Sequence, residues 1–272
     1  MTDMPAMFAV DDDGRYLPRK WAYGRWGADM LSGPAVCAAA ARTLEREHGL
    51  PGFVPARFTI DLFKAAKGQP LEVHTEVIRA GRRIHIASAT VRQGEVEVAQ
   101  ARLVQLRATD APPGEEWHSE HPFDPPTDAG VDWWYRSDND WSTSMGDHQN
   151  SGRKSLWAVP LSAVEGEERS AFVAAVVAAE STSLVTNWGS QGVGYINADL
   201  TVALDRLPVG DRIGLQAQTH LTGNGVSVGT ATLFDSRGPI GNGMVTAVGN
   251  TAAQIDFSAN GIDFSENRGA GR

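Results

Sequence analysis

The amino-acid sequence predicts an α+β fold in which one unit, a helix followed by an antiparallel meander of four strands, occurs twice. Each half of the chain has an alanine-rich helical stretch followed by four runs that are rich in β-branched residues and alternate in polarity. Adding 142 to the residue numbers of the first half aligns the two halves without a gap from Pro55 to Arg92. This alignment brings Thr59 onto Thr201 and Gly81 onto Gly223. An internal repeat of this kind predicts two similar domains.

The helix of the first half is expected from about Pro34 to His48, with proline in its first turn and Gly49 just beyond its end. Its counterpart in the second half begins at about Ser170. Both helices consist almost entirely of small or apolar residues over several turns, which indicates burial on most sides. We therefore expect each sheet to wrap around its own helix.

Four strands follow each helix. They are expected at 57–63, 71–79, 83–91 and 97–106 in the first half, and at 196–204, 213–221, 226–234 and 240–248 in the second half. The aligned glycines fall between strands, where a turn needs positive φ. Two half-sheets would expose unpaired edges, so we expect them to join into one continuous surface with the two helices on opposite sides.

An acidic, proline-rich segment separates the two units. One arginine and ten acidic residues lie between Ala108 and Asn150, so this segment alone carries a charge equal to the net charge of −9 of the chain. Its prolines exclude regular structure from about Ala111 to Thr127. The predicted parts are an N-terminal domain at 1–110, a linker at 111–130, a C-terminal domain at 131–255 and a flexible tail at 256–272.

The stretch WWYRSDNDW, which begins at Trp133, follows this linker. It is too aromatic to stay solvated, because exposed indole and phenol rings lose the free energy that burial provides. We expect it to pack back onto a domain or to roof a pocket.

Composition excludes several classes of function. The net charge of −9 opposes the phosphate backbone of nucleic acids, so no nucleic-acid partner is expected. The longest strongly apolar stretch, Ala171 to Ala179, is too short to span a membrane. The N-terminus carries Asp11, Asp12 and Asp13 and does not resemble a signal peptide. The single cysteine, Cys37, excludes an intramolecular disulfide and fits a reducing, cytoplasmic location.

Three stretches carry a resemblance to a known family. The small-residue opening of a hotdog helix is resembled by SGPAVCAAAA. The sheet behind that helix is resembled by PARFTIDLFKAAKGQPLEVHTEVIRAGRRIHIASATV. The second repeat of double-hotdog acyl-CoA thioesterases of the thioesterase II type is resembled by YINADLTVAL…LPVG. The resemblance extends from about Arg15 to Val248. It implies a double hotdog, two antiparallel sheets each wrapped around a central helix and joined into one continuous sheet.

The resemblance also implies a function. We expect a thioesterase-like protein that hydrolyses a medium- or long-chain acyl-CoA, or another acyl thioester, through a water oriented by an aspartate. No cofactor or metal is expected, and the chain is a possible homo-oligomer. The alternative is a non-catalytic protein that binds acyl-CoA or lipid on the same fold. A hotdog hydratase is disfavoured, because none of the seven histidines follows an aspartate by five residues.

The family's water-activating residues can be transferred to single positions. Asp199, in INADLTV, matches the catalytic aspartate, and Thr219 or Thr222 lies where the family's hydroxyl is found. Thr246 falls where the family has a glutamine, whose amide a threonine cannot reproduce. The carboxylate, hydroxyl and amide set is therefore incomplete. The alternative interpretation of Asp199 is that it only caps or turns the start of a strand.

Two further features are candidates for substrate binding. Gly33 corresponds to a glycine at the start of the family's helix, where exposed N–H groups face the thioester carbonyl, although it also fits a simple helix entry before Pro34. Arg79, Arg82 and Arg83 form the densest basic cluster and could bind the phosphates of coenzyme A. Ordinary solvated arginines of a hairpin are the alternative.

Other motifs fail on their context. The sequence from Gly225 to Gly229 matches G-x-S-x-G, but it lies within an expected strand and not at a strand-to-helix turn. His118 and His121 lie in the acidic linker with no second group of ligands, so no metal site is predicted.

Overall fold

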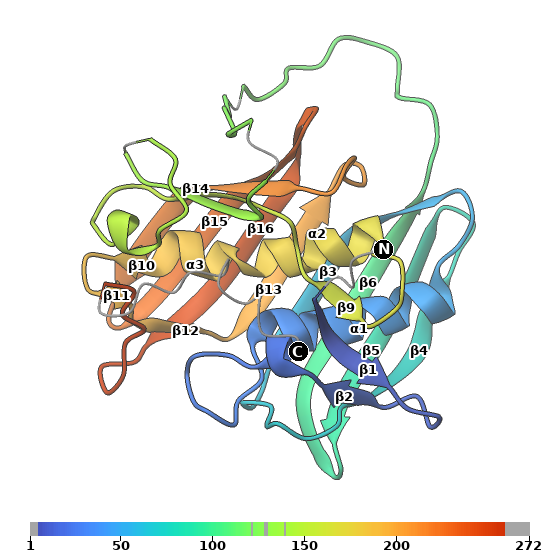
Figure 1. Cartoon of the computed structure of the whole chain (residues 1–272). Helices are drawn as coiled ribbons and strands as arrows, with labels where there is room; N and C mark the ends of the chain where they lie inside the picture. The colour runs from blue at the N-terminus through green and yellow to red at the C-terminus, as the bar shows by residue number, and fades with distance from the viewer. Residues whose placement is uncertain (1–4, 121, 128–129, 139, 259–272) are drawn as a thin grey trace.

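Figure 1 shows the computed structural model, which describes residues 5–120, 122–127, 130–138 and 140–258. An eleven-stranded sheet forms the frame, and its strand pairs are antiparallel. The α+β prediction is confirmed.

The predicted strands are all present. Those of the first half are β3 (Phe53–Leu62), β4 (Glu72–Ala80), β5 (Ile84–Gln93) and β6 (Val96–Arg107). Those of the second half are β12 (Tyr195–Asn197) with β13 (Asp199–Leu204), β14 (Ile213–Gly223), β15 (Val226–Asp235) and β16 (Gly238–Gly249).

The two halves of the sheet join where β3 pairs with β13. The register of this pair places Thr59 directly opposite Thr201, the residue onto which the internal repeat brings it. Each half therefore offers the same strand to the other, as two units related by a local two-fold axis do. The joining strand of each half thereby has a partner, which removes an exposed edge.

Two helices cover one face of this sheet (Figure 1). They are α1 (Gly33–His48) and α2 (Ala171–Glu180), and α2 continues into the short α3 (Thr182–Asn187). Each long helix begins at a serine cap: Ser32 Oγ accepts a hydrogen bond from the backbone N of Ala35, and Ser170 Oγ from that of Val173, both at 3.3 Å.

The expectation that the helices lie on opposite sides is wrong. Phe58 lies opposite Val202 and Ile60 opposite Leu200, all four are buried, and opposed residues point to the same face. Helix α1 packs against β5 and β6, and α2 against β13, β14 and β16. The helices also pack against each other. Periodicity identifies the inward residues of each half, but only the pairing of β3 with β13 turns both sets to one face.

The expected positive φ at turn glycines holds only in part. Gly94 (φ 56°) and Gly238 (φ 120°) fit the prediction, whereas Gly81 and Gly223 do not have positive φ. In the hairpin between β14 and β15 the turn is made by Asn224 (φ 53°) and the following glycine.

Several short elements were not predicted. These are β1 (Ala6–Val10), β2 (Tyr16–Pro18), η1 (Lys20–Ala22), β7 (Trp133–Arg136), η2 (Gly146–His148), β8 (Ser155–Ala158), β9 (Ser162–Val164), β10 (Trp188–Gly189) and β11 (Gly192–Val193). Strands β2, β1 and β9 form a separate small sheet, while β7 and β8 extend the large one. The strands of the large sheet run in the order β4-β5-β6-β3-β13-β16-β15-β14-β8-β7, and β12 also pairs with β16. The start of the aromatic stretch after the linker is thus a strand of the C-terminal half.

The described residues of the predicted linker contain no helix or strand. Phe123 nevertheless stacks on Phe234, with ring centroids 4.3 Å apart and planes 8° apart, and so fixes the linker to β15. In the predicted tail, Phe257 is buried against Trp188, and residues 259–272 lie outside the described residues. The predicted domain boundaries stay predictions. Among the described helices, none is long and apolar enough to cross a membrane.

Candidate active site

A cavity of about 710 Å³ lies between the two halves of the molecule. Residues of the N-terminal half, of α2 and α3, and of the segment after the linker line it together. Most of the lining is apolar. Its aliphatic and aromatic members include Val36, Leu62, Trp133, Tyr135, Met145, Leu156, Leu161, Val177, Leu184, Ile213, Ile255 and Phe257. Such a space fits an apolar chain better than a polar metabolite.

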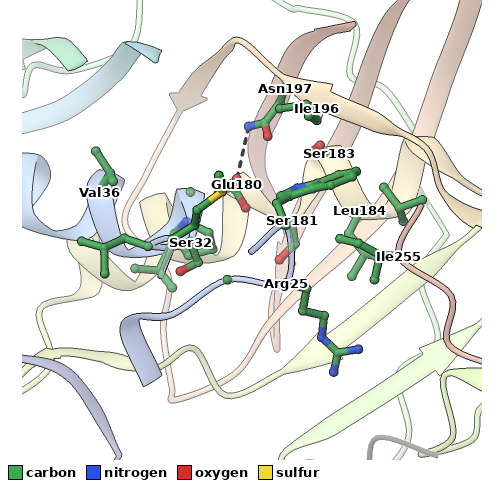
Figure 2. A pocket seen from close by; sticks show the side chains of 18 of the residues that line it. Arg25, Ser32, Val36, Glu180, Ser181, Ser183, Leu184, Ile196, Asn197 and Ile255 are labelled. Carbon is green, nitrogen blue, oxygen red and sulfur yellow. Dashed lines mark hydrogen bonds between the residues drawn. The ribbon is translucent and has the colours of Figure 1, made fainter. Parts of the chain in front are cut away.

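Among the residues that the structure describes, one acidic side chain lines this cavity, that of Glu180, the last residue of α2. Figure 2 shows it in the middle of the lining residues. Glu180 is only 8% exposed, and Nδ2 of Asn197 donates a hydrogen bond to its Oε1 at 3.2 Å. Burial raises the pKa of Glu180 to about 8, and the hydrogen bond from Asn197 partly offsets that rise. A carboxyl group with such a pKa exchanges a proton near neutral pH.

Gly33, the first residue of α1, lies against this carboxyl group. A Cβ at position 33 would overlap Oε1 of Glu180 and would lie 2.8 Å from its Cδ. Only glycine therefore fits here without moving the carboxyl group.

At the start of α1, one backbone N–H group has no hydrogen-bond acceptor among the described residues. Pro34 has no N–H, and the N–H groups of Ala35 and Val36 donate to Oγ and O of Ser32, each at 3.3 Å. The N–H of Gly33 has no acceptor among the described residues. It lies at the positive end of a sixteen-residue helix, where a negative oxygen is stabilised.

Asp199 occupies a different place. Its Oδ1 accepts a hydrogen bond from the backbone N of Thr246 at 2.6 Å, next to the bond from the N of Ala198 to the O of Thr246. The carboxylate thus completes the strand pairing where β12 passes into β13. Neither Asp199 nor Thr246 lines the cavity. This geometry fits the alternative interpretation, in which Asp199 organises the start of a strand.

The candidate hydroxyl groups lie far from Asp199. Thr219 and Thr222 are on β14, which is separated from β13 by β16 and β15. Thr219 Oγ1 shares a hydrogen bond with Thr230 Oγ1 at 2.7 Å. The structure therefore does not bring the predicted carboxylate and hydroxyl groups together. The role of these residues stays a prediction.

Of the predicted substrate-binding residues, the structure brings only Gly33 to the cavity. Arg79 lies on β4, at the edge of the sheet, and Arg82 and Arg83 lie in the hairpin between β4 and β5. None of the three lines the cavity.

Sequence reasoning missed Glu180 and Asn197. The signal for Glu180 was a lone acid at the end of the nine-residue apolar stretch Ala171 to Ala179, since a helix buried on most sides carries no charge without a reason. Asn197 stands two residues before Asp199, in the segment that drew attention to the aspartate.

Comparison with known proteins identifies relatives of both halves. Residues 22–106 match the family model described as the acyl-CoA thioesterase N-terminal domain. Residues 103–244 match the model described as the acyl-CoA thioesterase C-terminal domain. Among curated proteins, none matches the chain.

Solved structures share the fold at low sequence identity. The TesB protein of Mycobacterium avium subsp. paratuberculosis is 14% identical with a TM-score of 0.63, over 86% of this chain and 92% of that one. Acyl-CoA thioesterase II of Mycobacterium marinum is 13% identical with a TM-score of 0.59, over 80% and 90%. A hotdog-fold protein of unknown function from Alicyclobacillus acidocaldarius is 15% identical with a TM-score of 0.66, over 90% and 96%. The chain thus has a hotdog fold.

Proposed function

Because this chain belongs to the acyl-CoA thioesterase family, we propose that it hydrolyses a medium- or long-chain acyl-CoA with Glu180 as the general base. The single observation that carries this proposal is the contact between the carboxyl group of Glu180 and Gly33, at an apolar cavity. It joins a proton acceptor with a backbone donor at a helix N-terminus. Thioester hydrolysis needs both groups close to one carbonyl carbon.

In the proposed reaction the ionised carboxylate of Glu180 takes a proton from a water molecule as the water oxygen attacks the thioester carbon. The carbonyl oxygen gains negative charge and accepts a hydrogen bond from the N–H of Gly33, in the positive field of the α1 N-terminus. The C–S bond then breaks. The leaving thiolate takes the proton from Glu180, which releases the thiol and the carboxylic acid and regenerates the base.

The acyl chain would lie in the apolar part of the cavity, between the two halves. A volume of about 710 Å³ supports a chain of medium or long length. Trp133 and Tyr135, from the aromatic stretch after the linker, contribute to the wall. In this proposal the molecule is a double hotdog, and neither half alone encloses the substrate.

Two alternatives differ in their predicted behaviour. Asp199 could activate the water, as the family resemblance implies, although its Oδ1 is engaged by the backbone N of Thr246. A non-catalytic protein would keep the cavity and bind acyl-CoA without turnover.

A cytoplasmic location and self-association stay predictions. The prediction of a cytoplasmic location depends on the single cysteine, Cys37.

A thiol-release assay with acyl-CoAs of increasing chain length tests the proposal. It should be paired with mass spectrometry of the ligands that the purified protein retains. Release of free coenzyme A, with a maximum at medium or long chains, is the expected result. Retained acyl-CoA without any thiol release would support the binding protein instead.

A further inference from the structure

The charged side chains that line the cavity are mostly basic. Among the described residues, those other than Glu180 are Lys20, Arg25 and Lys64, all basic and all exposed. The chain as a whole has a net charge of −9. The cavity therefore combines an apolar interior with a basic rim, on a molecule that otherwise repels anions.

The three basic residues come from two neighbouring segments. Lys20 and Arg25 precede α1, and Lys64 follows β3. The backbone N of Leu31 donates to the O of Ala66 at 2.9 Å, so the segment before α1 lies beside the segment after β3.

Aromatic rings lie beside two of these cations. The Nζ of Lys20 lies 5.7 Å from the ring centre of Trp21, and the guanidinium carbon of Arg25 lies 5.3 Å from that of Phe257. Both rings also line the cavity. Cation–π contacts of this kind hold a positive charge at an apolar surface. Lys64 takes part in no ion pair with another described residue.

We propose that Lys20, Arg25 and Lys64 form the site that binds the phosphate groups of coenzyme A, in place of the hairpin residues Arg79, Arg82 and Arg83. The proposal rests on the proposed function, and it names the part of the substrate that the rim recognises. An acyl-CoA is an apolar chain joined through a thioester to a polyphosphorylated nucleotide. With the acyl chain inside and the thioester at Glu180, its phosphates leave the cavity past the rim.

This site has a consequence for selectivity. The enzyme should prefer an acyl-CoA over the matching acyl-pantetheine, which keeps the thioester and the arm but lacks every phosphate. Because the basic side chains are exposed, added salt should weaken this preference. The hairpin arginines should contribute little, since none of them lines the cavity.

The test compares kcat/KM for one acyl chain on coenzyme A and on pantetheine. In the double variant Lys20→Ala/Lys64→Ala we expect the preference for the coenzyme A form to fall about tenfold, the usual size of the loss of two partly exposed contacts to a charged group. Its dependence on salt should also decrease. Lys67→Ala is the matched control, because this lysine is exposed close to Lys64 but does not line the cavity. The variant Arg79→Ala/Arg82→Ala tests the hairpin.

Equilibrium binding of free coenzyme A, followed by tryptophan fluorescence, separates this proposal from the catalytic one. If the rim binds phosphate, the double rim variant weakens coenzyme A binding even if the protein has no thioesterase activity. Two results would overturn the proposal. One is an unchanged preference and affinity in the rim variant, and the other is a loss confined to the hairpin variant.

Discussion

Glu180 and Gly33 come from opposite halves of the chain, yet a single added carbon at position 33 would overlap the carboxyl oxygen of Glu180. The end of α2 therefore meets the start of α1 in the lining of the cavity. A buried carboxyl group from one half and a helix N-terminus from the other therefore meet in one cavity, which neither half contains alone.

The contact predicts that Gly33→Ala lowers kcat/KM by at least about tenfold, because the carboxyl group must move away from the thioester carbon. Thiol-release kinetics measure the loss. Gly223→Ala is the control, since a Cβ at position 223 meets no atom within 4 Å. Equal activity of the two variants would contradict the role given to this contact.

The hydrogen bond from Asn197 predicts a shift in pH dependence. It lowers the pKa of Glu180, so Asn197→Leu should raise that pKa further above about 8. The acid limb of the profile of kcat/KM against pH should then move to higher pH. An acid limb at the same pH in both proteins would show that Glu180 does not control the reaction.

Glu180 also makes stability depend on pH. Its pKa is raised in the folded state to about 8 from an ordinary value of 4.5, so the folded protein holds a proton that the unfolded chain loses. The free energy of unfolding of the wild type, relative to Glu180→Gln, should fall as pH rises from about 4.5 to about 8 and then level off. The slope is at most about 1.4 kcal/mol per pH unit. Urea unfolding of both proteins at several pH values measures it, and parallel curves would contradict the shift.

Much of this fold could be predicted from the sequence, because strand alternation and the repeat are local patterns. The predicted eight strand regions and both long helices are present. The common face of α1 and α2 could not be predicted, since it depends on Phe58 lying opposite Val202 in a pairing between halves. Short strands such as β7 and β10 have too few residues to show a period.

The site was harder to predict than the fold. Asp199 drew attention because it stands in a recognisable motif, but its carboxylate is engaged by the backbone of Thr246. Glu180 can be recognised in the sequence as a lone acid at the end of an apolar helix. Its partners Gly33 and Asn197 are not its neighbours in the sequence, so its contacts could not be predicted. The packing of α1 against α2 brings Gly33 to Glu180, and β12, which pairs with β16, brings Asn197.

We expect Met145, in the segment after the linker, to limit the length of the acyl chain that the cavity accepts. Met145 is buried and lines the cavity. Met145→Ala should enlarge the space and shift the preferred acyl-CoA towards longer chains, at a cost of about 2 to 5 kcal/mol in stability. Met145→Leu keeps the volume and should keep the preference. Kinetics over a chain-length series decide this, and an unchanged optimum in Met145→Ala would place the end of the chain elsewhere.

Single-turnover thiol release at a pH above 8 by Glu180→Gln and Asp199→Asn tests the central claim most directly. Both changes remove a negative charge and keep an oxygen acceptor, so the amide oxygen introduced by Asp199→Asn could still accept the bond from the Thr246 backbone. We predict that Glu180→Gln lowers the rate by about 10²-fold or more, the usual share of a general base, and that Asp199→Asn stays within a few-fold of the wild type. A large loss in Asp199→Asn, with Glu180→Gln close to the wild type, would contradict the account.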